Sequence, residues 1–72
     1  MMISARNQLA GTVEHVNADG VMAEVIVRLR GGECVVSAIT ADSARRLGLA
    51  PGKAVTVLMK STEVMIGVDD AR

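Results

Sequence analysis

The stretch VMAEVIVRLR, residues 21 to 30, decides the fold of this chain. Its residues alternate, so that one face carries Val21, Ala23, Val25, Val27 and Leu29. A period of two is typical of a β-strand that buries one face. The other face is polar, with Glu24 and Arg28, but Met22 and Ile26 interrupt it. The stretch therefore predicts a long strand with one buried face and a second face that is partly apolar.

Turn signals on both sides of this strand divide the rest of the chain. They are NADG at 17–20, RGGE at 30–33 and APGK at 50–53. The runs between them predict further strands at 11–16, 33–40, 54–60 and 63–68. The segment TADSARRLG at 40–48 predicts one short helix, with Thr40 as N-cap, Asp42 in the first turn and Gly48 at C′. This order predicts an all-β fold, a five-stranded OB-like barrel with one short helix between strands 3 and 4.

Size and composition indicate one domain, residues 1–72, that associates with other copies. Half of the 72 residues are apolar, which is more than a small core can bury. Eight basic residues balance eight acidic ones, and the chain has no Phe, Tyr or Trp. A basic groove with aromatic stacking platforms, as in single-stranded nucleic-acid binding, is therefore not expected.

The remaining composition predicts a cytoplasmic protein with no membrane partner. No signal peptide is recognisable, and no apolar run reaches the ~20 residues that a membrane helix needs. A single cysteine, Cys34, fits a reducing compartment. We expect Cys34 to be a small buried apolar residue and His15 to be an ordinary strand histidine, since neither has a catalytic or ligating neighbour in sequence. No residues have metal-ligand spacing, and no catalytic constellation is recognisable, so an enzyme is not expected.

Three segments are rich in hydrogen-bond donors. SAR supplies Ser4, Arg6 and the backbone near Ala5, KS supplies Lys60 and Ser61, and TADS supplies Thr40 and Ser43. A tetrahedral oxyanion needs such an inventory of guanidinium, ammonium, hydroxyl and backbone N–H groups. Taken singly, the segments have simpler explanations, such as a helix cap or a solvated strand end.

The sequence resembles a known family in these same segments. SARNQLAGTV, AEVIVRL, ITADSARRLGL and PGKAVTVLMKSTEVMIG are similar to the molybdopterin-binding-like (Mop) domain of the molbindins, from about Ser4 to Ile66. The resemblance implies an OB-like barrel that binds molybdate or tungstate as an intact oxyanion, with no organic cofactor. It implies storage of the oxyanion in the cytoplasm. The alternative is a ligand-sensing module that regulates a larger partner.

The resemblance also implies where the oxyanion binds. Sites at subunit interfaces would be built from Ser4, Ala5, Arg6, Thr40, Ser43, Lys60 and Ser61. The subunits would form dimers, and three dimers would form a homohexamer. Further oxyanion sites would lie near its threefold axis, and DGVMAE at 19–24 is a candidate region for them. We expect Arg6 and Lys60 of one pocket to come from different chains, because an N-terminal arm can reach a neighbouring subunit.

Overall fold

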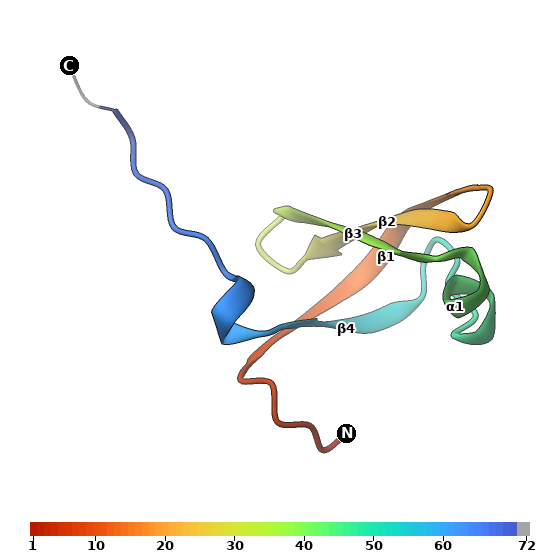
Figure 1. The fold of residues 1–72 in the computed structure, drawn as a ribbon, viewed down its shortest axis with the longest axis horizontal. Helices are drawn as coiled ribbons and strands as arrows, with labels where there is room; N and C mark the ends of the chain where they lie inside the picture. The colour runs from red at the N-terminus through yellow and green to blue at the C-terminus, as the bar shows by residue number, and fades with distance from the viewer. Residues whose placement is uncertain (71–72) are drawn as a thin grey trace.

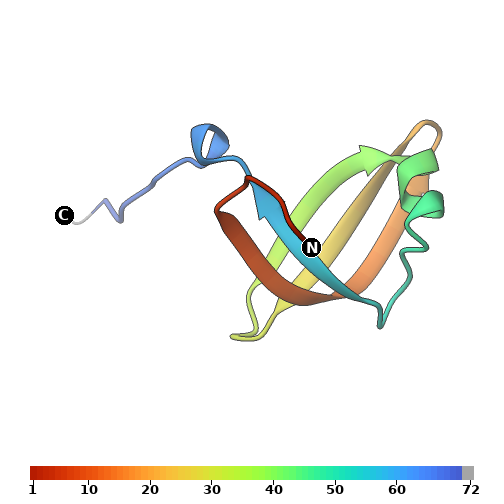
Figure 2. The same ribbon diagram turned by 90° about the horizontal axis from the view of Figure 1, so that it is seen from below.

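A curled antiparallel sheet of four strands forms the body of the domain (Figures 1 and 2). The structure is a computed structural model that describes residues 1–70. Its elements are β1 (Asn7–Asp19), β2 (Met22–Leu29), β3 (Cys34–Thr40), α1 (Ala41–Arg46), β4 (Ala54–Met59) and the 3-10 turn η1 (Ser61–Glu63). The strand order is β3-β2-β1-β4, so β3 and β4 are the two edges of the sheet.

The inner face of the curled sheet holds the core. Ala23, Val25 and Val27 of β2 are only 1%, 3% and 4% exposed, which confirms the middle of the predicted buried face. Val21, predicted for the same face, is 77% exposed, because it lies in the turn before β2 begins at Met22. Val25 and Val27 pack with Val13 of β1, and a ring of half-buried residues surrounds them: Val16, Leu29, Ile39, Leu49, Val55 and Val57. The core is small and aliphatic, as the composition predicted.

Strand β1 is longer than predicted, because it pairs on both sides. It pairs with β2 along most of its length and with β4 from Asn7↔Met59 to Thr12↔Ala54. Gly11 permits the close approach to β2, since a Cβ there would lie 2.6 Å from Val27 Cγ1 and 2.8 Å from the Arg28 carbonyl oxygen. A bulge between Val13 and His15 shifts the register, and such a bulge bends a strand. Pairing with β4 thus draws the donor-rich N-terminus into the sheet.

Helix α1 covers one end of the sheet. Thr40 is its N-cap as predicted, and Gly48 has φ 65° just after its last turn. The Gly48 N–H donates to the Arg45 carbonyl and the Leu49 N–H to the Ala44 carbonyl, each at 3.0 Å, which is a Schellman motif. The buried Ala44 and its neighbour Ala41 pack against Ala23 of β2.

The prediction of a fifth strand at 63–68 is wrong, because the described residues form only four strands. After η1 the chain extends away from the sheet (Figures 1 and 2), and Met65, Ile66 and Val68 are 92%, 87% and 90% exposed. A strand needs an edge to pair with, and this segment points away from both edges of its own sheet. The predicted closed barrel is therefore an open, curled sheet in a single chain. We call residues 64–70 the C-terminal arm.

Candidate oxyanion site

The N-terminal donor segment is held by two side chains that follow it. Ser4 and Arg6 are exposed and Ala5 is half-buried, just before β1 begins at Asn7. The Gln8 side-chain amide donates to the Ala5 carbonyl at 2.6 Å, and the Asn7 amide donates to the Met59 carbonyl at 3.3 Å. The sequence predicted no role for either amide. Only the fold shows which carbonyls they reach.

The second donor segment begins where β4 ends. Lys60 and Ser61 are exposed, and the Glu63 N–H donates to the Lys60 carbonyl at 2.9 Å to close the turn η1. Because Asn7 pairs with Met59, Arg6 and Lys60 are the residues that immediately flank this pair. The register therefore places the residues Arg6 and Lys60 opposite each other, just beyond the last strand pair of one chain. The expectation that they come from different chains stays a prediction, and the register of β1 against β4 favours the alternative that both come from one chain.

The third group, Thr40 and Ser43, lies at the start of α1. Thr40 Oγ1 accepts the Ser43 N–H at 3.0 Å and donates to Ser43 Oγ at 2.8 Å. Arg46 Nη2 also donates to Ser43 Oγ, at 3.2 Å. A hydroxyl has two acceptor lone pairs and one hydrogen, so these two contacts leave the Ser43 hydrogen as the group's unused donor. The Arg46 contact was not predicted.

This third group is far from the other two in a single chain. Thr40 pairs with Met22, which in turn pairs with Asp19 at the end of β1. Arg6 precedes the opposite end of the same strand, which has 13 residues and a contour of roughly 40 Å at the usual rise. Both ribbon views place α1 and η1 at opposite ends of the sheet (Figures 1 and 2). One chain therefore brings the SAR and KS segments to the same end of the sheet and places Thr40 and Ser43 at the other end.

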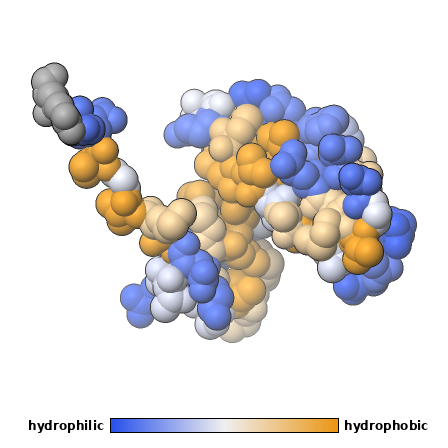
Figure 3. All heavy atoms as spheres, turned by 45° about the horizontal axis from the view of Figure 1, so that its top comes forward, coloured by the Kyte–Doolittle hydropathy of each residue, from blue (hydrophilic) through white to orange (hydrophobic). Residues whose placement is uncertain are grey.

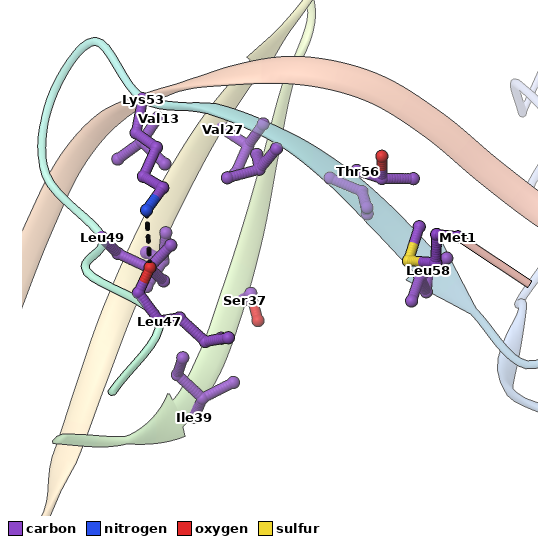
Figure 4. A pocket seen from close by; sticks show the side chains of 13 residues that line it. Met1, Val13, Val27, Ser37, Ile39, Leu47, Leu49, Lys53, Thr56 and Leu58 are labelled. Atoms are coloured by element: carbon purple, nitrogen blue, oxygen red, sulfur yellow. Dashed lines mark hydrogen bonds between the residues drawn. The ribbon is translucent and has the colours of Figure 1, made fainter. Parts of the chain in front are cut away.

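A large cavity lies on the inner face of the sheet, and its lining is apolar, unlike the polar donor groups. Its volume is about 400 Å³, and its walls are mostly aliphatic side chains of all four strands and of the turn after α1 (Figure 4). Lys53 lies at its margin, where its ammonium donates to the Leu47 carbonyl at 2.8 Å. An aliphatic cavity cannot satisfy the acceptor oxygens of a dianion. The cavity is thus the open interior of the sheet and not the oxyanion site.

A separate polar cluster occupies the outer face of the sheet. Arg28 Nε donates to Glu14 Oε1 at 2.8 Å, and the Cys34 thiol lies 3.5 Å from Glu14 Oε2. The hydrogen bonds from Arg28 and then from Cys34 lower the pKa of Glu14. Partial desolvation, and then the contact with Glu14, raise the pKa of Cys34. The expectation of a buried Cys34 is wrong, because its position on β3 faces outward and the residue is exposed.

Comparison with known proteins identifies the family. The TOBE domain model matches residues 3–66. The chain is 48% identical over 66 residues to molybdenum-pterin-binding protein 3 of Clostridium pasteurianum, covering 92% of this chain and 97% of that protein.

The chain belongs to the TOBE domain family. Among solved structures, this TOBE domain is 41% identical to a molybdate-binding protein from Sporomusa ovata, with a TM-score of 0.88 and coverage of 94% and 100% of the two chains. It is 38% identical to the cytoplasmic molybdate-binding protein ModG with molybdate bound, with a TM-score of 0.90, covering 96% of this chain and 49% of ModG. The predicted resemblance to the molbindins is confirmed. The names of these relatives describe binding, which agrees with the expectation of a binding domain rather than an enzyme.

Two further observations concern the described residues of this TOBE domain. Nowhere in residues 1–70 do three or more His, Cys, Asp or Glu side chains gather in a way that could hold a metal ion. No helix in the same range is long and apolar enough to cross a membrane.

Proposed function

We propose that this TOBE domain binds molybdate or tungstate as an intact tetrahedral dianion between two copies of the chain. One copy supplies Ser4, the backbone at Ala5, Arg6, Lys60 and Ser61, and the other supplies Thr40 and Ser43. The observation that carries the proposal is the Asn7↔Met59 pair, because it places a residue with a guanidinium and a residue with an ammonium next to each other at the ends of adjacent strands. Similarity to two molybdate-binding structures supports the choice of ligand.

The proposed mechanism is charge-assisted hydrogen bonding with no covalent bond to molybdenum and no organic cofactor. Arg6 and Lys60 offset the two negative charges, while hydroxyl and backbone N–H groups match the four oxygens. The free hydrogen of Ser43 suits this role, because both lone pairs of its oxygen are engaged. Sulfate has the same charge and shape but is smaller, so the size of the pocket should select against it.

An interface site requires an assembly, and the exposed apolar surface supports one. Figure 3 shows hydrophobic residues along the arm, up to its hydrophilic end, and on parts of the body, and the inner cavity is open. We infer that the arm of one chain adds to the open sheet of another, which supplies the missing fifth strand and closes the barrel. We propose that the single domain 1–72 forms dimers of this kind, and that three dimers join as a homohexamer. Storage of the oxyanion in the cytoplasm is the role that such an assembly would fit.

Mixing two defective variants tests the interface site. In the proposed pocket, Arg6 comes from one copy and Ser43 from the other. Arg6→Ala and Ser43→Ala should each weaken molybdate binding in equilibrium dialysis. After the two variants are refolded together, about half of the dimers are mixed, and one pocket in each mixed dimer is intact, so roughly a quarter of all pockets recover.

The matched control mixes Arg6→Ala with Lys60→Ala. These residues flank the same strand pair, so every mixed pocket lacks at least one cation and no binding should return. Recovery in the control mixture but not in the first would place Arg6 and Lys60 on different chains and overturn the proposed arrangement. Native mass spectrometry confirms that mixed oligomers formed.

A further inference from the structure

Building on the proposed function, we propose that Asn7 and Gln8 are positioning residues of the oxyanion site. Neither is expected to touch the ligand. Each instead donates a side-chain hydrogen bond to a carbonyl in one of the two donor segments: Gln8 to Ala5, and Asn7 to Met59, the residue before Lys60. The two amides therefore hold SAR and KS in fixed relative positions before an anion arrives.

The Gln8 contact controls the direction of a backbone donor. A trans peptide unit is planar, and its C=O and N–H point in opposite directions. The Ala5 carbonyl and the Arg6 N–H belong to the same peptide unit. When Gln8 Nε2 holds that carbonyl at 2.6 Å, the Arg6 N–H must point the opposite way. Gln8 thereby fixes a backbone donor of the site as well as the base of the Arg6 side chain.

The Asn7 contact fastens the end of the sheet on which the site depends. The Asn7↔Met59 pair is the last one between β1 and β4, and the ends of paired strands fray most easily. The Asn7 side chain adds a bond from its Nδ2 to the Met59 carbonyl, at 3.3 Å in a half-buried position. This bond holds the last rung before Arg6 and Lys60, which follow on the two strands at the same end, so we expect it to keep the spacing of these two residues constant.

Apolar substitutions of similar size can show whether Asn7 and Gln8 position the binding site or only stabilise the fold. Gln8→Met and Asn7→Leu keep the side-chain size and remove the donor. Thr12→Val is the control, because Thr12 is an exposed polar residue in the middle of the same strand. For each protein we would measure molybdate and sulfate affinity by calorimetry, and ligand-free stability by urea unfolding.

We expect Gln8→Met and Asn7→Leu each to weaken molybdate binding about three- to tenfold, the usual worth of one hydrogen bond. The ratio of molybdate to sulfate affinity should also fall, because a loosened pocket discriminates size less well. The ligand-free urea midpoint should stay close to that of Thr12→Val. Gln8→Ala gives a second test at Gln8 if the Met variant fails to fold.

Two results would overturn the positioning role. The first is that both variants bind molybdate with the same affinity and the same selectivity over sulfate as Thr12→Val. The other is a loss of affinity that follows a lower urea midpoint, with the affinity ratio unchanged, since this is what a purely structural role produces. In both cases wild-type binding stands. Failure of the wild-type protein to bind molybdate would instead refute the proposed function.

Discussion

Glu14 shows how a single side chain can make the stability of this domain depend on pH. Its carboxylate accepts hydrogen bonds from Arg28 and then from Cys34, and these lower its pKa. A carboxyl group with a lowered pKa stabilises the fold fully above its unfolded pKa, about 4.3. That stabilisation is lost as the pH falls through the lower folded value.

We therefore expect Glu14→Gln to lower the thermal midpoint at neutral pH by a small amount, because the group is exposed. The difference from wild type should shrink as the pH falls below about 4.3. Thermal unfolding followed by circular dichroism from pH 7 to pH 3 measures it. Glu24→Gln, on an exposed position of β2, is the control. A difference that stays constant over the whole range would contradict the assignment.

At the scale of elements, the start of α1 combines a helix cap with a proposed ligand donor. Thr40 Oγ1 accepts the Ser43 N–H, and loss of such a cap costs about 1 kcal/mol. Thr40→Ala should therefore lower the free energy of unfolding by about 1 kcal/mol. It should also weaken molybdate binding, because Ser43 would no longer be oriented by the Thr40 hydroxyl.

Thr40→Ser is the matched control for that prediction, since it keeps the hydroxyl and removes only a methyl group. Urea unfolding and calorimetry on both variants provide the comparison. Equal stability of Thr40→Ala and wild type would mean that the cap contributes nothing. Equal molybdate affinity of the two would remove Thr40 from the proposed pocket.

At the scale of the whole molecule, the C-terminal arm is the feature that a single chain does not explain. Val64, Met65, Ile66 and Val68 are 43%, 92%, 87% and 90% exposed. Truncation after Glu63 should therefore abolish the oligomer, as measured by native mass spectrometry, because it removes the proposed fifth strand. Molybdate at 100 times its Kd should stabilise the full chain by ~2.7 kcal/mol per site. It should not stabilise the truncated chain.

The control for the truncation keeps the arm but changes its character. Met65→Asp with Ile66→Asp preserves the length and places charge where burial is proposed, so it should disrupt the assembly as well. A truncated chain that kept its oligomeric mass and its response to molybdate would show that the arm is dispensable. The proposed closure of the barrel would then be wrong.

Much of the fold could be predicted from local patterns. The alternation in β2, the turns, the Thr40 cap and the Gly48 C′ position are all properties of neighbouring residues, and the structure confirms them. The resemblance to the molbindins drew attention to SAR and KS for the same reason, because each motif is contiguous. Cys34 and the segment 63–68 were predicted wrongly, since exposure and strand pairing depend on what lies opposite in space.

The sequence by itself determined the all-β class, the short helix and the family, and it named the candidate donor residues. Only the tertiary structure decided how the donors are distributed. The register of β1 against β4 sets Arg6 beside Lys60, and the length of β1 puts Thr40 and Ser43 at the other end of the sheet. The physical reason is that a strand or turn pattern is visible within a few consecutive residues, whereas strand register depends on residues about fifty positions apart in the sequence. Backbone hydrogen bonds between paired strands have no signature in either strand alone.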